Sequence, residues 1–293
     1  MDQVIRGLSA LLMICLGLGL GVWLARRRRL PWGLFGIGAA TFVASQVAHI
    51  PFNSLVLNRA LVALGFPEPA STGALIGASL LLGLSAGVFE EGARYLMYRF
   101  WAKKARSWEQ GLMIGAGHGG IEAVLLGVLT GYTLLQMLAL RGVDLATIVP
   151  ADQLEVARLQ VEAYWTTPWY GVLLGPVERL LAICLHLSLS VMVLQCFTRR
   201  NWLWLPLAIG WHALLDAVAV AAGMRFGVYW TEALLGLMAL ISLGVVFRLR
   251  GPVAANEAQP DAPEPPRVLR LAEDTPPTHD QLDDSRFTGG TQV

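Results

Sequence analysis

Charged side chains are scarce in this sequence: they make up 15% of its 293 residues, where soluble domains average about 25%. The formal net charge is only +1 at pH 7, which gives no reason to expect a nucleic-acid partner, and we predict none. Hydrophobic residues make up 55% of the chain, and its mean hydropathy is +0.55. This composition is typical of a polytopic membrane protein and argues against a soluble domain.

Cysteine is scarce as well. The three cysteines, Cys15, Cys184 and Cys196, each lie in an apolar run and show no metal-type spacing. This pattern argues against a disulfide framework, and we interpret them as small hydrophobic residues. The sequence also lacks the His-Glu-x-x-His motif of soluble zinc proteases, and no internal repeat stands out. A metal site would therefore have to draw its ligands from separate segments.

Seven apolar runs are each long enough to cross the roughly 30 Å hydrocarbon core of a bilayer as a helix. They predict an all-α membrane domain over residues 1–250, with spans at about 4–25, 33–57, 74–101, 110–138, 169–197, 202–222 and 228–248. The first run has no basic segment ahead of it and no small-residue cleavage site after it. We therefore interpret it as a retained helix and not as a signal peptide.

The basic residues predict how the chain is oriented. If seven helices are drawn, four basic clusters fall on one side of the membrane: Arg26–Arg29, residues 103–106, Arg199–Arg200 and Arg248–Arg250. Cytoplasmic loops carry an excess of Lys and Arg, so we expect a plasma-membrane protein, embedded in lipid, with its N-terminus outside and its C-terminus in the cytoplasm. Residues 251–293 are rich in Pro, Thr, Gln and acidic residues and are predicted to form a disordered cytoplasmic tail.

The one sizeable outer loop, residues 141–168, contains a segment with helical periodicity. Its apolar residues recur at helical spacing over 152–164, and three aromatic residues follow: Trp165, Trp169 and Tyr170. We predict a short helix that lies on the membrane surface, near a substrate entrance. A plain solvated loop is the alternative.

Two adjacent carboxylates interrupt the third apolar run. Glu90 and Glu91 are followed by Arg94, all within a segment that otherwise reads as a membrane span. A charged side chain at bilayer depth costs at least about 2.5–3.5 kcal/mol, so this pair needs a structural or functional reason. On a helix, Arg94 can pair with Glu90 at i,i+4 or with Glu91 at i,i+3. Alone, the stretch is compatible with a structural ion pair that joins two helices.

Histidines in three later spans favour a functional reading. Each has a polar neighbour on its own helix: His118 precedes Glu122, His212 precedes Asp216, and His186 follows Glu178 and Arg179. Counted from the basic clusters, Glu90 and these three histidines all lie about 12–13 residues deep, on the order of 18–20 Å. The sequence thus predicts one polar layer drawn from four helices. Each imidazole could instead be a satisfied helix contact, and we assign no role to His49 or His279.

Carboxylates and imidazoles in one dry layer are the groups of a hydrolytic centre. A glutamate can take a proton from water while histidines hold a metal or stabilise the oxyanion. The predicted ligands of a divalent metal, zinc being the first candidate, are His118, His186 and His212, with Glu90 or Glu91 as base or ligand. Glu122 and Asp216 are placed to orient imidazoles or to contact the metal. Glu178, two turns further out, either pairs structurally with Arg179 or lines the outer mouth.

These residues resemble a known group of proteins. Glu90-Glu91-Gly92-Ala93-Arg94 fits the Glu-Glu-x-x-Arg pattern of the type II CAAX prenyl endopeptidases and bacteriocin-processing intramembrane proteases. His212 to Asp216 resembles their last motif, a His followed four residues later by Asn or a related polar residue. The run from Gly117 to Ala123, the segment Pro176 to Arg179 and the span pattern look closest to the YhfC-type branch of intramembrane metalloproteases; PrsW-type proteases are more distant relatives. The resemblance covers residues 1–250.

The resemblance implies roles for individual residues. It points to Glu90 and Glu91 as the pair that activates water, to His118 as the middle histidine and to His212, with Asp216, as the last one. The sequence departs from the pattern twice: Leu112 and Ile114 occupy the region of an aromatic residue ahead of the middle histidine, and Asp216 replaces Asn. Both departures leave the substrate class open, and specificity for prenylated proteins is not carried over.

Our reading of the sequence is an intramembrane endopeptidase that acts on a membrane protein or on a lipidated or hydrophobic peptide. Arg94 would hold the carboxylate pair in position. A proton-coupled or metal-binding transporter is the first alternative, and it would call for a water path that opens to both sides in turn. A b-type haem protein with two axial imidazoles and a non-catalytic membrane scaffold are the others.

Overall fold

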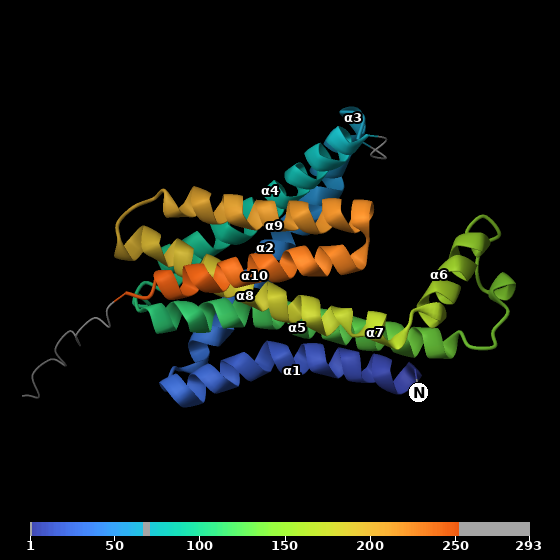
Figure 1. Cartoon of the computed structure of the whole chain (residues 1–293), viewed down its shortest axis with the longest axis horizontal. Coiled ribbons are helices and arrows are strands. Elements are labelled where there is room, and N and C mark those ends of the chain that lie inside the picture. The colour runs from blue at the N-terminus through green and yellow to red at the C-terminus, as the bar shows by residue number, and fades with distance from the viewer. Residues whose placement is uncertain (1, 67–70, 252–293) are drawn as a thin grey trace, which may run out of the picture. The chain divides into compact units, whose positions relative to one another are not determined.

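The computed structural model describes residues 2–66 and 71–251, and these residues form helices joined by turns. Seven membrane-length helical stretches are present among them (Figure 1), which confirms the predicted all-α architecture. They are α1 (Asp2–Arg28), α2 (Trp32–Phe52) with η1 (Asn53–Leu57) and α3 (Asn58–Ala63), α4 (Thr72–Leu96) with η2 (Met97–Trp101), α5 (Trp108–Ala139), α7 (Trp169–Val172) with α8 (Leu174–Thr198), α9 (Trp204–Phe226) and α10 (Val228–Arg248).

The second stretch is longer than the sequence indicated, because the π-helical turn η1 carries the helix on to Ala63 instead of ending it near 57. The loop after α5 contains a 3₁₀ turn, η3 (Leu145–Thr147), and a helix, α6 (Leu154–Thr166), which covers most of the segment with helical periodicity. The expectation that α6 lies on the membrane surface stays a prediction. So does the orientation of the termini, and the predicted tail over 252–293 lies outside the described residues.

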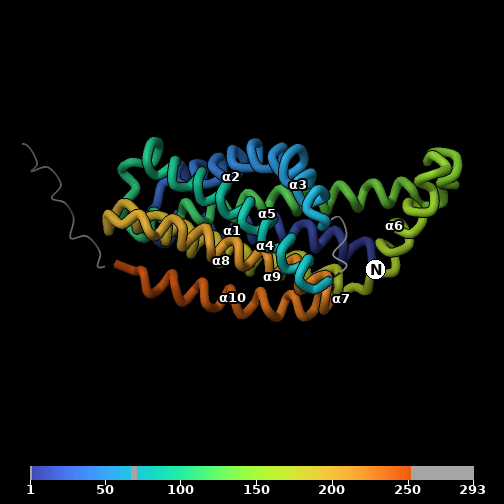
Figure 2. The backbone as a smooth tube through the Cα atoms, turned by 90° about the horizontal axis from the view of Figure 1, so that it is seen from above, coloured from blue at the N-terminus to red at the C-terminus, as the bar shows by residue number. Residues whose placement is uncertain are grey.

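The two helices at the centre of the bundle are α5 and α8. In their most apolar windows 61% and 72% of the residues are buried, against 28–33% in the other five stretches. Helix α1 packs on α5, α2 packs between α4 and α5, α4 packs on α9, and α10 covers α8 and α9 (Figure 2). This packing surrounds the middle of α8 with polar segments from α4, α5 and α9.

A capping box fixes where α5 begins. The Ser107 hydroxyl accepts a hydrogen bond from the Gln110 backbone N–H, and the Gln110 side chain accepts one from the Ser107 N–H at 3.0 Å. Such reciprocal caps satisfy donors that a helix start leaves unpaired. The helix therefore starts at Trp108, which places His118 about three turns into the bundle.

Glycines on α5 allow neighbouring backbones to approach closely. A Cβ added to Gly117 would lie 2.0 Å from the Phe35 carbonyl oxygen of α2, and one added to Gly38 would lie 2.0 Å from the Ile114 carbonyl oxygen. These distances are far below any real contact, so the two helices can cross here only because both positions lack a side chain. Next to this crossing, His118 is completely buried.

We therefore expect Gly117→Ala to lower the stability of the protein by about 1–3 kcal/mol or more, because the backbone of α2 cannot yield as a side chain would. Thermal unfolding of the detergent-purified variant measures this effect. Gly92→Ala is the matched control, because a Cβ on Gly92 of α4 meets nothing within 4 Å. Equal melting temperatures for the two variants would contradict this account of the α2–α5 crossing.

Candidate active site

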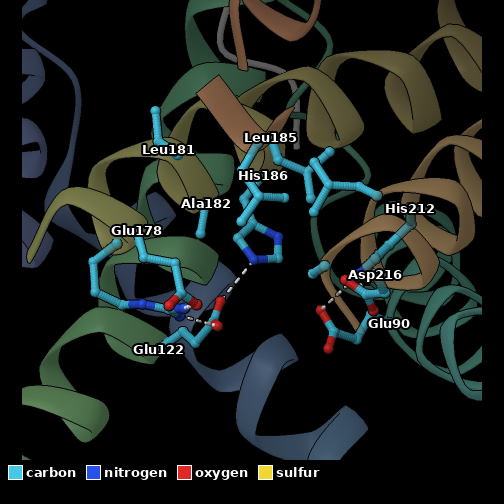
Figure 3. A pocket seen from close by; sticks show the side chains of 13 residues that line it. Glu90, Glu122, Glu178, Leu181, Ala182, Leu185, His186, His212 and Asp216 are labelled. Atoms are coloured by element: carbon cyan, nitrogen blue, oxygen red, sulfur yellow. Dashed lines mark hydrogen bonds and ion pairs between the residues drawn. The ribbon is translucent and has the colours of Figure 1, made fainter. Parts of the chain in front are cut away.

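The polar residues singled out in the sequence converge on one region of the bundle. Glu90, Glu91 and Arg94 come from α4, His118 and Glu122 from α5, Glu178 and His186 from α8, and His212 and Asp216 from α9. The ring centroid of His186 lies 4.8 Å from that of His118 and 5.9 Å from that of His212. A cavity of about 150 Å³ is lined by Glu90, Glu122, Glu178, Arg179, His186, His212 and Asp216 together with apolar residues (Figure 3).

Glu90 is the carboxylate of the pair that lines this cavity. Its Oε2 lies 3.0 Å from Nε2 of His118 and 4.0 Å from Nε2 of His212. Its Oε1 accepts a hydrogen bond from the Gln46 side chain of α2, at 2.9 Å. Because partners from α2 and α5 hold opposite oxygens, the carboxylate is fixed in orientation while part of it stays open to the cavity.

Glu91 has a different environment. It is completely buried, pairs with Arg94 one turn later, and accepts a hydrogen bond from Nδ1 of His212 at 2.9 Å. Arg94 is completely buried as well. Of the two pairings that helix geometry allowed for Arg94, the structure therefore forms the one with Glu91. Hydrogen bonds to the remaining groups help to offset the desolvation cost of a buried ion pair, and His212 supplies one to Glu91.

The bond to Glu91 determines how His212 faces the cavity. Because a carboxylate accepts at Nδ1, this nitrogen carries the proton, and Nε2 is turned toward Asp216, at 3.6 Å, and Glu90. A carboxylate on the far nitrogen of an imidazole is the usual way to orient a ligand or catalytic histidine. Asp216 was expected to lie beside His212, and the structure places it there.

Glu122 contacts a different histidine from the one its spacing suggested. It lies one turn after His118 on α5, but its Oε2 is 2.7 Å from Nε2 of His186 on α8. The other nitrogen of His186, Nδ1, is 3.4 Å from Nη2 of Arg94, which can only donate. His186 therefore accepts from Arg94 and donates to Glu122.

Arg179 joins the remaining acidic residues. It donates to Glu122 at 2.5 Å and also pairs with Glu178, its neighbour on α8. The sequence left two readings open for the Glu178–Arg179 pair, a structural role or a place at the mouth of the site. The structure combines them, because the pair braces Glu122 and lines the cavity.

The donor set fits a divalent metal. Ligand atoms from Glu90, His118 and His186 all lie within 4.8 Å of one another, and each residue is buried. A tetrahedral zinc site, with metal–ligand distances of about 2.1 Å, brings ligand atoms to about 3.4 Å. Because Nε2 of His186 donates to Glu122, the metal would take the lone pair of Nδ1 in place of the contact with Arg94. The sequence grouped His118 and His186 with His212. The structure groups them with Glu90, and Nε2 of His212 lies 4.0 Å from the same Oε2 of Glu90 that His118 contacts.

Gln46 was missed by the sequence reasoning. A single uncharged amide in an apolar run is common, and nothing in its spacing connects it with Glu90 on another helix. The available signal was weak: Gln46 lies three residues before His49, so both face α4. His49 itself stacks on Phe89 with ring centroids 5.4 Å apart and hydrogen-bonds Asn53 at 2.9 Å, outside the metal-binding group.

Comparisons with known proteins found one family and one relative. The sequence model of the YhfC intramembrane metalloprotease family matches residues 12–247. The chain is 34% identical over 221 residues to a protein of Bacillus subtilis (strain 168) described as "Uncharacterized membrane protein YhfC", and the match covers 74% of this chain and 83% of that protein. No solved structure matched the chain.

Proposed function

Because this chain belongs to the YhfC intramembrane metalloprotease family, we propose that it is an endopeptidase that hydrolyses a peptide bond of a membrane protein or hydrophobic peptide. The observation that carries the proposal is the different environment of the two adjacent carboxylates. Both oxygens of Glu91 are occupied by contacts with Arg94 and His212. Glu90 also has a partner on each oxygen, but it lines a cavity with room for water.

In this proposal Glu90 is the general base. Its carboxylate takes a proton from a water molecule in the cavity as the water attacks the peptide carbonyl, and it returns that proton to the leaving amine. His212, oriented by Glu91 through Nδ1, would act as an imidazolium, whose second proton on Nε2 is donated to the oxyanion. Arg94 keeps Glu91 and His186 in place through its contacts with both.

His118 and His186 are the residues that would hold a divalent metal beside Glu90. When bound, such a metal would polarise the peptide carbonyl and favour loss of a proton from water. Glu122 fixes the orientation of His186 through its 2.7 Å contact, and Arg179 in turn fixes Glu122.

The test does not require a known substrate. Purified protein is reconstituted with solubilised membrane proteins of the expression host, and new N-termini are identified by mass spectrometry. We expect new termini in membrane proteins, lost after chelator treatment and restored by zinc. If folded, zinc-loaded preparations of several purities yield no termini above a control lacking the protein, the endopeptidase assignment fails.

Gln46 provides a further prediction. Gln46→Leu should lower the cleavage rate by roughly tenfold, because Glu90 loses the donor that fixes its Oε1. Gln195→Leu is the control: the Gln195 side chain donates to a backbone carbonyl on its own helix, away from the cavity. Comparison of kcat for the two variants tests whether Gln46 positions Glu90 for catalysis. An equal loss in both would assign Gln46 a role in stability alone.

A further inference from the structure

The cavity extends from the histidine layer in one direction only. We define the basic face as the end of the bundle with the basic clusters Arg26–Arg29, residues 103–106, Arg199–Arg200 and Arg248–Arg250, and the loop face as the end with residues 140–168. Helices α5 and α9 run from the basic face, so Glu122 and Asp216, each one turn after its histidine, lie closer to the loop face. Helix α8 runs the other way, so Glu178, eight residues before His186, lies about 12 Å closer to the loop face.

Apolar lining residues follow the same direction. Ala219 is two turns after His212 on α9, and Leu235 lies in the first half of α10, which starts at the loop face. The positions of lining residues on four helices, α5, α8, α9 and α10, thus independently indicate that the cavity extends toward the loop face. Every lining residue named beyond the histidine layer is displaced toward the loop face.

The exposure of the carboxylates increases along this path. The side chain of Glu90 is 9% exposed, that of Glu122 21%, that of Asp216 33% and that of Glu178 45%. A carboxylate in a membrane span is stable only where water or a partner reaches it. The gradient therefore describes a polar passage whose lining becomes more exposed away from Glu90.

The opposite end of the site is closed by packed side chains. Glu91, Arg94 and Tyr98 are all completely buried. One turn below Arg94, the Tyr98 hydroxyl lies 2.9 Å from that of Ser190, which donates to the Gly111 carbonyl at 2.7 Å. These bonds join η2, α8 and α5 between the histidine layer and the basic face.

We infer that water and substrate reach the site only from the loop face, through the mouth lined by Glu122, Glu178, Arg179 and Asp216, and that the Tyr98–Ser190 contact seals the other end. The consequence for substrates rests on the proposed function: the scissile bond must be presented from the loop-face half of the membrane. An alternating-access transporter would instead open to both faces.

Cysteine accessibility tests the inference without measuring activity. Cys15, Cys184 and Cys196 are replaced by alanine, and Ala182→Cys is introduced into the cavity lining. Right-side-out cells and inverted vesicles are treated with membrane-impermeant methanethiosulfonates, which attack thiolates in water. Gln160→Cys on α6 marks the loop face, and Lys104→Cys marks the basic face.

Ala182→Cys should react in the same preparation as Gln160→Cys and not in that of Lys104→Cys. Because the mouth is rich in carboxylates, the cationic trimethylammonium reagent should react roughly tenfold faster than the anionic sulfonate reagent. Leu214→Cys, on the 45%-exposed outer side of α9, is the control for exposure to lipid and should not react. Ala219→Cys repeats the test from another helix in case the first variant does not fold.

Reaction of both cavity cysteines from the basic face, or from the two faces alike, would overturn the inference. The inference would also be overturned if the two marker cysteines react but the cavity cysteines react from neither face. This test does not measure cleavage of substrates, so its failure is separate from failure of the endopeptidase proposal. If only the endopeptidase proposal failed, the protein would still have a cavity that opens to one face.

Discussion

Glu90→Gln should reduce cleavage at least a hundredfold, while the protein still folds. Glutamine has nearly the same shape as glutamate and can still contact Gln46 and His118, but it cannot take a proton from water. Loss of a general base typically costs 10²- to 10⁴-fold in rate, so about 10² is the lower bound. Counting the new N-termini produced by equal amounts of folded wild type and variant measures the effect.

The neighbouring carboxylate supplies the contrast. Glu91→Gln leaves Arg94 buried without its charged partner, which typically costs about 3–5 kcal/mol, so this variant should melt at a markedly lower temperature. Glu155→Gln, on exposed α6, should change neither the cleavage rate nor the melting temperature. If Glu90→Gln cleaves at the wild-type rate, Glu90 is not the base. If Glu90→Gln melts as low as Glu91→Gln, the two carboxylates do not have the separate roles proposed here.

Removal of His118 or His186 should abolish metal binding. The wild-type protein, purified without chelator and loaded with zinc, is expected to retain about one equivalent per chain after gel filtration. His118→Gln and His186→Gln each remove one of the two histidines that would hold the metal beside Glu90, and these variants should retain almost none. Elemental analysis of the detergent-purified proteins measures this directly and needs no substrate.

Two further histidines make the experiment specific. His49→Gln removes an intramembrane imidazole that lies outside the clustered group, and this variant should retain the wild-type amount of zinc. His212→Gln should retain zinc with weaker affinity, because His212 is not one of the three grouped residues but its Nε2 lies 4.0 Å from Glu90, which is. Equal zinc contents in wild type, His118→Gln and His186→Gln would place the metal elsewhere. A wild type that binds no zinc would leave Glu90 to act on water without it.

Family membership and fold were accessible from the sequence because they depend on local properties. Whether a run of residues can cross a bilayer follows from its length and apolarity, and a charge in such a run must turn inward because its transfer to lipid is costly. The equal depth of Glu90, His118, His186 and His212 could therefore be read from residue counts. The structure brings these four side chains together, as the counts predicted.

The pairing of the side chains was not accessible in the same way. Helical spacing allowed Arg94 to reach either carboxylate, and it placed Glu122 next to His118 on the same face. Which contacts form depends on how helices rotate and cross, and this is set by features such as the close approach of α2 at Gly117. For the same reason Gln46 could not be found: its partner Glu90 is 44 residues away on another helix.

The sequence by itself determined seven helices, a shared polar layer and the chemical groups within it, because hydrophobic periodicity and the cost of buried charge act within each segment. Only the tertiary structure decided that Glu90 lines the cavity while Glu91 is paired with Arg94, that His186 is held by Glu122, and that the cavity lining extends toward the loop face. These features depend on which helix faces meet, and the meeting of faces is a property of packing between segments distant in the chain.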